Sequence, residues 1–270
     1  MVEPSLTVRA SSWPSLFDCA YKWEGIHLLG MRNTVGLRAA LGTAIHAGTA
    51  AFDQGRLDDS GVSIIDATGV MIDKLHDPEN EFDHGRDGIT MKEAEFIGVS
   101  LVSEYCQVWS PKYNFVAIEM NTKEFDIDCG NGVVIRLKGT LDRARIKKTT
   151  AGVGIADLKS GGNSVQNGVA VTKGHAAQIG TYELLYEHTT GQQITSEAEI
   201  IGLKTKGKAE IASGVIGNAK QIMVGDENNK GLIEFAANMF RTGMFYPNPK
   251  STLCSEKYCP RWKKCIFKGD

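Results

Sequence analysis

The stretch Ile155-Ala-Asp157-Leu-Lys159-Ser-Gly161 closes a predicted strand, and the strand before it carries Gly139-Thr-Leu-Asp142-Arg143. Side chains alternate between the two faces of a strand, so Asp157 and Lys159 are expected on the same side of the sheet. Two carboxylates at neighbouring strand ends form a hard-oxygen site for Mg²⁺ or Mn²⁺, and each would be costly there without a cation. We therefore predict a metal site and catalytic centre at Asp142 and Asp157, with Lys159 to orient water or to stabilise charge on a phosphate oxygen.

The chain around these two stretches has the pattern of β-strands from residue 114 onward. Apolar or alternating runs separated by turn residues occupy residues 115–118, 124–129, 133–146 and 153–158. The pair Asn131-Gly132 between two of these runs is a strong hairpin signal. An Asp-x-Lys tripeptide taken alone also fits ordinary charges at a strand end, so the surrounding pattern decides its interpretation.

Helices are expected on both sides of this strand region. Ser11 or Ser12 with Pro14 resembles a helix start. The remaining predicted helices span residues 42–52, 90–109, 175–187 and 222–242, and a further strand spans residues 197–203. This order predicts an α/β or α+β domain with a central mixed sheet flanked by helices.

Composition is that of a soluble globular protein. The 270 residues are 42% hydrophobic and 23% charged, which is sufficient for an ordinary buried core. No apolar run approaches the roughly 18 residues of a membrane span, and no signal-peptide pattern opens the chain, so we expect a cytoplasmic protein without a membrane partner. The formal net charge of -2 lacks the basic surplus of a protein that coats nucleic acid, although basic residues gather at 241–270 and could hold DNA.

Several motifs in this order resemble the PD-(D/E)XK nucleases, and within them the RecB-like exonucleases with CRISPR-associated and phage-borne members. The resembling stretches are Ser11-Ser-Trp-Pro-Ser-Leu-Phe-Asp-Cys19, Gly42-Thr-Ala-Ile-His46, Gly139-Thr-Leu-Asp142-Arg143, Asp157-Leu-Lys159 and Gln178-Ile-Gly-Thr-Tyr182. The resemblance implies one nuclease domain over residues 1–270. Residues 1–110 would be its mainly helical part, residues 111–245 a restriction-endonuclease-like α/β core, and residues 246–270 a cysteine-rich segment.

The resemblance adds residues to the acidic pair. It implies that His46 is a third metal ligand, where a packing histidine would otherwise be the simpler interpretation. Gln178 and Tyr182 are four residues apart and share a helix face, which would contact a DNA strand as substrate-binding residues. Glu119 interrupts an apolar run and is a secondary candidate for the metal site, although an acid on an edge strand facing water explains it equally well.

Four cysteines form a second candidate site. Cys254, Cys259 and Cys265 lie in the last segment and Cys19 near the first residues, and four thiolates can ligate a [4Fe-4S] cluster. The iron–sulfur branch of the RecB-like nucleases distributes its cysteines in this way, which implies that residues 246–270 pack against Cys19. The interval between Cys254 and Cys259 is longer than in that branch, so tetrahedral zinc and a site without metal remain alternatives.

The predicted function is a Mg²⁺- or Mn²⁺-dependent exonuclease that hydrolyses DNA in recombination, repair or replication. Its preference for single-stranded or free DNA ends is implied by the resemblance alone. A nuclease-derived module that binds DNA without cutting is the alternative, and the complete set of His46, Asp142, Asp157 and Lys159 argues against it. A cytosolic zinc or iron–sulfur redox protein would leave the acidic motifs unexplained.

Overall fold

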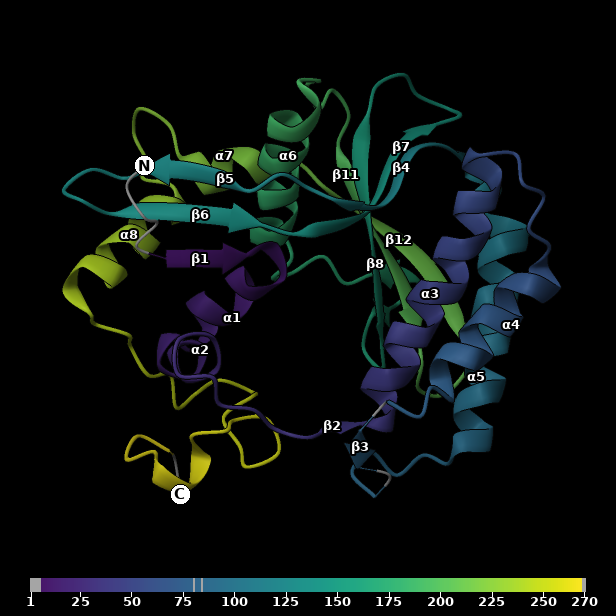
Figure 1. The fold of residues 1–270 in the computed structure, drawn as a ribbon, viewed down its shortest axis with the longest axis horizontal. Coiled ribbons are helices and arrows are strands. Elements are labelled where there is room, and N and C mark those ends of the chain that lie inside the picture. The colour runs from purple at the N-terminus through teal and green to yellow at the C-terminus, as the bar shows by residue number, and fades with distance from the viewer. Residues whose placement is uncertain (1–5, 80, 84, 269–270) are drawn as a thin grey trace.

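A five-stranded mixed sheet forms the centre of the computed structural model (Figure 1), which describes residues 6–79, 81–83 and 85–268 of the predicted domain. Its strands, in spatial order, are β12 (Glu210–Ile216), β11 (Ala198–Lys204), β8 (Gly154–Gly161), β7 (Thr140–Lys147) and β4 (Tyr113–Asn121). Strands β8 and β11 run parallel, and the other neighbours run antiparallel. The predicted central mixed sheet is confirmed; β12 was not predicted.

A second, three-stranded sheet lies beside the first. It orders β1 (Leu6–Arg9), β6 (Val134–Lys138) and β5 (Phe125–Asp128), with β1 and β6 parallel. The predicted hairpin at Asn131-Gly132 is confirmed, because both residues have positive φ and join β5 to β6. Two short strand pairs complete the β-structure: β2 (Val35–Gly36) with β3 (Phe82–Asp83), and β9 (Val165–Gln166) with β10 (Val169–Ala170).

The prediction of a single strand over residues 133–146 was wrong, because Gly139 separates β6 from β7 and the two strands belong to different sheets. A Cβ on Gly139 would lie 3.0 Å from the Tyr182 ring and 3.1 Å from Cβ of Ala10. The chain therefore changes sheet at a point where the surrounding side chains leave little room for any residue but glycine.

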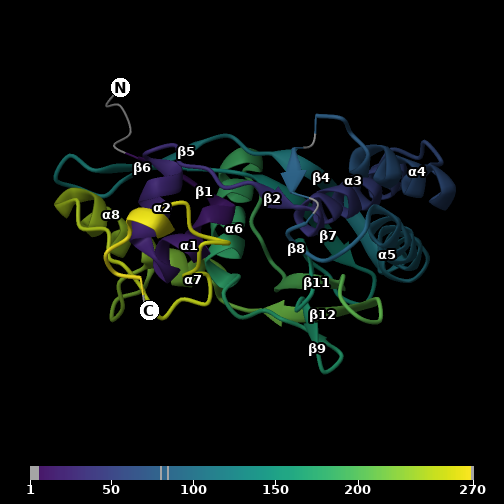
Figure 2. The same ribbon diagram turned by 90° about the horizontal axis from the view of Figure 1, so that it is seen from below.

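Helices cover both faces of the five-stranded sheet (Figure 2). On one face pack α3 (Leu37–Leu57), α4 (Ile64–Leu75) and α5 (Met91–Glu104), and on the other packs α6 (Ala176–Thr190), which is followed later in the chain by α7 (Ala219–Val224). Strand β8 shows the two-sided burial: Leu158 joins the core under α3, and Ile155 joins the core under α6. The catalytic stretch predicted from the sequence is thus a central strand enclosed by two cores.

Local signals account for most helix boundaries. Helix α5 begins with a capping box at Thr90 and continues as a π-helical turn, Tyr105–Trp109, to a short turn that contains Pro111. Helix α4 was not predicted, although Ser63 and Asp66 form a capping box at its start. The predicted single helix over residues 222–242 was wrong. Gly225, with φ of 79°, ends α7, and α8 (Leu232–Thr242) begins after a loop.

The C-terminal segment lies against the first two helices, α1 (Trp13–Asp18) and α2 (Ala20–His27). The carbonyl of Tyr246 accepts from the N–H of Tyr21, and Arg261 forms an ion pair with Glu24 at 2.9 Å. Within residues 243–268 the regular structure is one 3-10 turn, Trp262–Lys264, and both these polar contacts and aromatic packing, such as that of Phe245 on Trp23, hold the segment in place. In the described part of the chain, every helix is too short or too polar for a membrane span.

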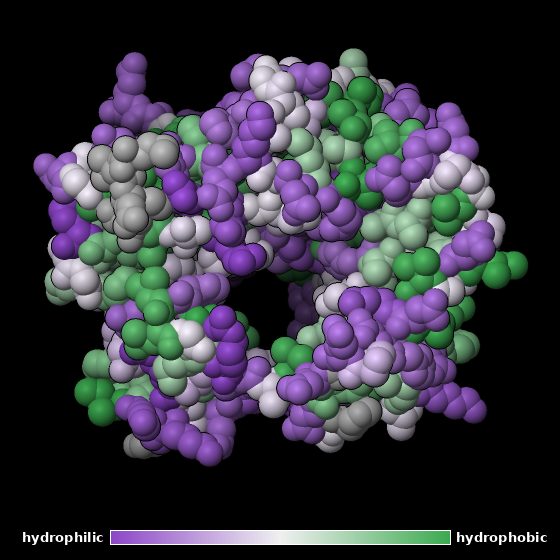
Figure 3. Space-filling model, viewed as in Figure 1, coloured by the Kyte–Doolittle hydropathy of each residue, from purple (hydrophilic) through white to green (hydrophobic). Residues whose placement is uncertain are grey.

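An opening passes through the molecule between β8 and the helices α1 and α2 (Figure 3). Its lower rim in this view is closed where the C-terminal segment meets the chain around β2 and β3. There Nζ of Lys257 lies 3.1 Å from Oδ1 of Asp87, and the carbonyl of Lys257 accepts from Nδ2 of Asn33 at 3.5 Å.

Candidate active site

Helix α3 presents a polar row to the sheet. Gly42, His46, Thr49 and Asp53 follow one another at intervals of three or four residues, which places them on one helical face. Gly42 lets the helix lie close to β8, because a Cβ there would be 2.6 Å from Oγ of Ser160. This close approach brings the His46 imidazole to the carboxylates of the neighbouring strands.

Asp142 lies where β7 and β8 part. The paired register of these strands ends at Arg143 and Ala156. Beyond that pair, the N–H of Leu158 donates to Oδ2 of Asp142 at 2.8 Å, and the same oxygen lies 3.6 Å from Nδ1 of His46. Past the last β7–β8 backbone pair, the Asp142 carboxylate therefore accepts the hydrogen bond of the Leu158 N–H. The two strands separate at this point, and His46 approaches it from helix α3.

Glu119 reaches the same point from β4 with an unusual backbone conformation. The strand pairs on either side of it, Ile118 with Arg143 and Met120 with Leu141, bracket Glu119 and Asp142. Its φ is 42°, in the left-handed region. For a residue other than glycine this conformation costs about 1–3 kcal/mol and persists where the surrounding structure imposes it, as at functional sites. The Glu119 side chain, 43% exposed on the edge strand β4, also lies beside the acidic centre, with Oε1 3.0 Å from Nη1 of Arg143, and its role as a metal ligand stays a prediction.

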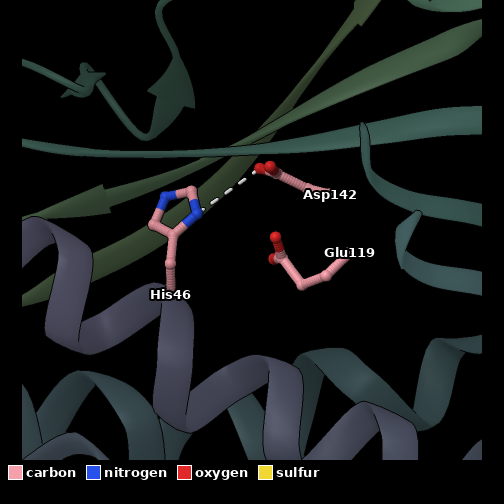
Figure 4. Close-up of side chains that lie close together, drawn as sticks. All are labelled: His46, Glu119 and Asp142. Atoms are coloured by element: carbon pink, nitrogen blue, oxygen red, sulfur yellow. Dashed lines mark ion pairs between the residues drawn. The ribbon is translucent and has the colours of Figure 1, made fainter. Parts of the chain in front are cut away.

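Ligand atoms of His46, Glu119 and Asp142 all lie within 4.8 Å of one another, and their side chains converge on one point (Figure 4). Within the described ranges, no other three His, Cys, Asp or Glu side chains meet in this way. Burial lowers the pKa of His46, which favours the neutral imidazole that binds metals. Burial and the charge of Asp142 raise the pKa of Glu119, so the two carboxylates crowd each other. This donor set fits a divalent cation.

Asp157, the other predicted metal ligand, lies beside these three candidate ligands but is not part of the group. Its Oδ2 is 2.6 Å from Nζ of Lys159, and its Oδ1 accepts from Nε2 of Gln178 at 3.2 Å. The same amide donates to the hydroxyl of Tyr182 at 3.1 Å. Gln178 and Tyr182 are buried, so they hold Asp157 from the α6 side, and their contact with DNA stays a prediction.

Electrostatics at Asp157 favour the arrival of a cation. Burial raises the pKa of this carboxyl, Lys159 opposes the rise, and the nearby Asp142 adds to it. A divalent cation would compete with the proton for the carboxylate oxygens, so metal affinity is expected to increase with pH.

Three residues near the site, Arg143, Asp53 and His175, were given no role from the sequence. Arg143 and Asp53 form a buried ion pair behind the ligands, with 2.6 Å between Nε and Oδ2. His175 stands one turn before Gln178 on the site-facing side of α6; burial and then the charge of Lys159 lower its pKa to about 4. The spacing of His175, Gln178 and Tyr182 was a signal for a shared helix face. No comparable local signal identifies Asp53 as the partner of Arg143.

The four cysteines predicted as cluster ligands line a single pocket with Lys22, and they are Cys19, Cys254, Cys259 and Cys265. All are free thiols, and the N–H of Asn248 donates to Sγ of Cys19 at 3.4 Å. Among these four described residues, no three sulfur atoms lie within 4.8 Å of one another. The lysine is buried, which places a positive charge beside the thiols. The pocket thus brings Cys19, from the N-terminal part of the chain, together with the three cysteines of the C-terminal segment.

The mixed sheet and the imidazole–carboxylate group together define an α/β protein with a candidate divalent-metal centre at parted strands. The family model of the PD-(D/E)XK nuclease superfamily matches residues 10–266, and the chain belongs to this superfamily. Its members are nucleases that use divalent metals, so the substrate is a nucleic acid.

Structural comparison supports the fold independently. The structure is similar to a crystal structure from Eubacterium rectale of a protein provisionally named as an exonuclease, with a TM-score of 0.54 and 11% sequence identity. The alignment covers 98% of this chain and 91% of that chain. At this identity the likeness concerns the fold, and it confirms the predicted restriction-endonuclease-like α/β core. A comparison with curated proteins found no match.

Proposed function

We propose that this nuclease is a Mg²⁺- or Mn²⁺-dependent deoxyribonuclease that degrades DNA from single-stranded ends, in the cytoplasm, as part of recombination, repair or replication. The observation that carries the proposal is the convergence of His46, Glu119 and Asp142 within 4.8 Å, from one helix and two strands. Imidazole nitrogen and carboxylate oxygens on rigid elements are the ligands that catalytic divalent metals require.

Each residue has a distinct task in this proposal. His46, Glu119 and Asp142 hold the cation, and Asp157 offers a further carboxylate oxygen at its edge. Bound there, the cation supplies charge neutralisation and activation of water. Lys159, held 2.6 Å from Asp157, provides a positive charge for the phosphate oxygen that becomes more negative during hydrolysis. Gln178 keeps the Asp157 carboxylate oriented from the opposite side.

The opening beside β8 supports an activity that begins at DNA ends. An enclosed opening admits a single strand by its free end, whereas a closed circle cannot enter without being cut. The contact between Lys257 and Asp87 closes the rim, so the opening is a passage and not an open groove. Single-stranded and end-bearing DNA is therefore the proposed substrate.

We further propose that the cysteine pocket holds a [4Fe-4S] cluster. Cys19, Cys254, Cys259 and Cys265 line one pocket, and four thiolates are the ligand set of such a cluster. The buried charge of Lys22 offsets the net negative charge of a thiolate-bound cluster.

The test incubates the protein with end-labelled linear double-stranded, circular single-stranded and linear single-stranded DNA, with Mg²⁺ or Mn²⁺. We expect nucleotides or short products from linear single strands and much slower loss of circles. Equal cleavage of circular and linear DNA would refute the dependence on ends. Metal-independent binding without products from any DNA would favour the inert DNA-binding module instead.

A further inference from the structure

We infer that Arg143 is a positioning residue that fixes Glu119 in the metal site, and that its own orientation is set by a buried ion pair with Asp53. The inference deepens the proposed function, because it assigns a determinant of metal affinity to residues that are remote from substrate. Neither Arg143 nor Asp53 offers a ligand to the metal.

All three nitrogens of the Arg143 guanidinium are engaged, and its side chain is 0% exposed. Nε contacts Oδ2 of Asp53 at 2.6 Å, and Nη2 donates to Oγ1 of Thr49 at 3.3 Å. Nη1 donates to two acceptors, Oε1 of Glu119 at 3.0 Å and the backbone carbonyl of Asp142 at 2.8 Å. One side chain thus joins the α3 face to two of the three candidate ligand residues.

Asp53 is itself held in a single orientation. It is fully buried in α3, its Oδ2 accepts from the Tyr105 hydroxyl at 2.7 Å, and its Oδ1 accepts from Oγ of Ser110 at 2.6 Å. Tyr105 opens the π-helical turn Tyr105–Trp109, a distortion that often marks functional sites. The network therefore runs from this turn through Asp53 and Arg143 to Glu119.

The geometry indicates positioning as well as stability. A buried ion pair contributes little net stability, because desolvation offsets much of the attraction. The planar guanidinium instead fixes directions, which a lysine ammonium cannot do at several acceptors at once. Glu119 needs such a constraint, since its φ of 42° would relax if nothing held the carboxylate.

Strand β7 provides a matched control two residues further on. Arg145 is also 0% exposed, its Nη2 lies 3.5 Å from Oε2 of Glu199, and that oxygen accepts from the Tyr113 hydroxyl at 3.1 Å. This second arginine–acid–tyrosine network contacts none of the three candidate ligands in the described structure. Equivalent substitutions in the two networks separate an effect on metal binding from an effect on packing.

The experiment compares R143K with R145K, and Y105F with Y113F, by Mn²⁺ binding in calorimetry or electron paramagnetic resonance without DNA. Groups behind metal ligands typically change metal affinity by about 10- to 100-fold, so we expect R143K to weaken Mn²⁺ binding by about tenfold or more. Y105F removes only one of the donors to Asp53, so it is expected to weaken binding by less, about two- to fivefold, which is below that range. The controls should leave the affinity unchanged, although thermal unfolding shifts in both networks.

A double-mutant cycle tests whether Arg143 acts through Glu119. In E119Q, R143K should weaken Mn²⁺ binding far less than it does in the wild type. Independent, multiplying effects of the two substitutions would overturn the inference, and so would unchanged affinity in R143K. If R143K does not fold, Y105F decides, and equal affinities for Y105F and Y113F overturn it. Tight Mn²⁺ binding by a wild type that cuts no DNA would refute the proposed function alone.

Discussion

The candidate metal centre and the cysteine pocket differ in how closely the fold brings their candidate ligand atoms together. In the metal centre, ligand atoms of His46, Glu119 and Asp142 already lie within 4.8 Å of one another. In the cysteine pocket, four thiols line one cavity, but no three of these described sulfurs come that close. The first site stands on a helix and two neighbouring strands of the five-stranded sheet, whereas three of the four cysteines stand in a segment that is mostly turns and loop.

The two sites therefore have opposite relations to the fold: the fold positions the first site, whereas the second site would stabilise the fold. Packing of α3 against the sheet positions the first site, so its substitution should change chemistry more than stability. In the proposed function the second site is completed by a cluster, and binding of that cluster would contribute directly to the folding free energy. The comparison can be tested by removing ligands from each site in turn.

The largest expected effect is on cleavage in D142N. Asparagine keeps an oxygen to accept from the N–H of Leu158 but removes the charge that the cation needs. We expect the single-turnover cleavage rate to fall by about 10²- to 10³-fold, the range of single electrostatic contributions to catalysis, while the free energy of unfolding changes by less than about 1 kcal/mol. A large loss of thermal stability in D142N, with part of the activity retained, would show that Asp142 serves the fold more than the chemistry.

The next effect is on stability in C259A. Removing one cysteine should abolish visible absorbance in anaerobically purified protein and lower the free energy of unfolding by about 2–4 kcal/mol, as the loss of a disulfide does in a small domain. Hydrogen exchange should rise first in residues 246–268. C129A is the control, because Cys129 lies outside the pocket and should keep the absorbance. Wild-type protein without iron or labile sulfide would contradict the cluster.

A smaller effect concerns the pH dependence of Mn²⁺ binding. Burial raises the pKa of Asp157 and of Glu119, so protons compete with the cation at low pH. Affinity should therefore increase with pH, by about tenfold per pH unit wherever one proton is displaced on binding. Calorimetry in buffers of different ionisation enthalpy measures the released proton directly. Affinity independent of pH would show that the ligands are already ionised.

The smallest expected effect is on the pH dependence of stability in E183Q, which tests whether a raised carboxyl pKa alone marks a metal site. Glu183 on α6 is buried away from the three ligands, and burial raises its pKa to about 7. Its folded pKa lies above the unfolded value, so the folded protein loses stability as pH rises from about 4.5 to 7. E183Q should remove roughly 2 kcal/mol of this loss, as denaturant unfolding at pH 5 and pH 8 would measure. Mn²⁺ affinity should remain unchanged; a weaker affinity would place Glu183 in the site.

Local patterns predicted the elements that carry the chemistry. Asp157 and Lys159 were expected on one face of a strand, and the structure places their charged atoms 2.6 Å apart. The hairpin at Asn131-Gly132 follows from residues that tolerate positive φ. In contrast, the break at Gly139 depends on Tyr182 and Ala10, which are distant in sequence, so the pattern of apolar residues continued through it.

The sequence motifs identified the candidate residues of the site, but the sequence did not predict how these residues are arranged around one another. Glu119 had two interpretations in the sequence, and only the pairing of β4 with β7 places it beside Asp142. Asp53 shares a helix face with His46, but its partner Arg143 comes from a strand 90 residues later. Buried partners of this kind depend on tertiary packing, which single-sequence periodicity does not specify.

The single glycine between β6 and β7 has a mechanical consequence. Strand β6 ends at Lys138 and β7 begins at Thr140, so the two sheets are joined there by a link without slack. Asp142 follows three residues after that link. A rigid-body displacement of the small sheet would therefore be passed along a short stretch of chain to Asp142, a candidate metal ligand.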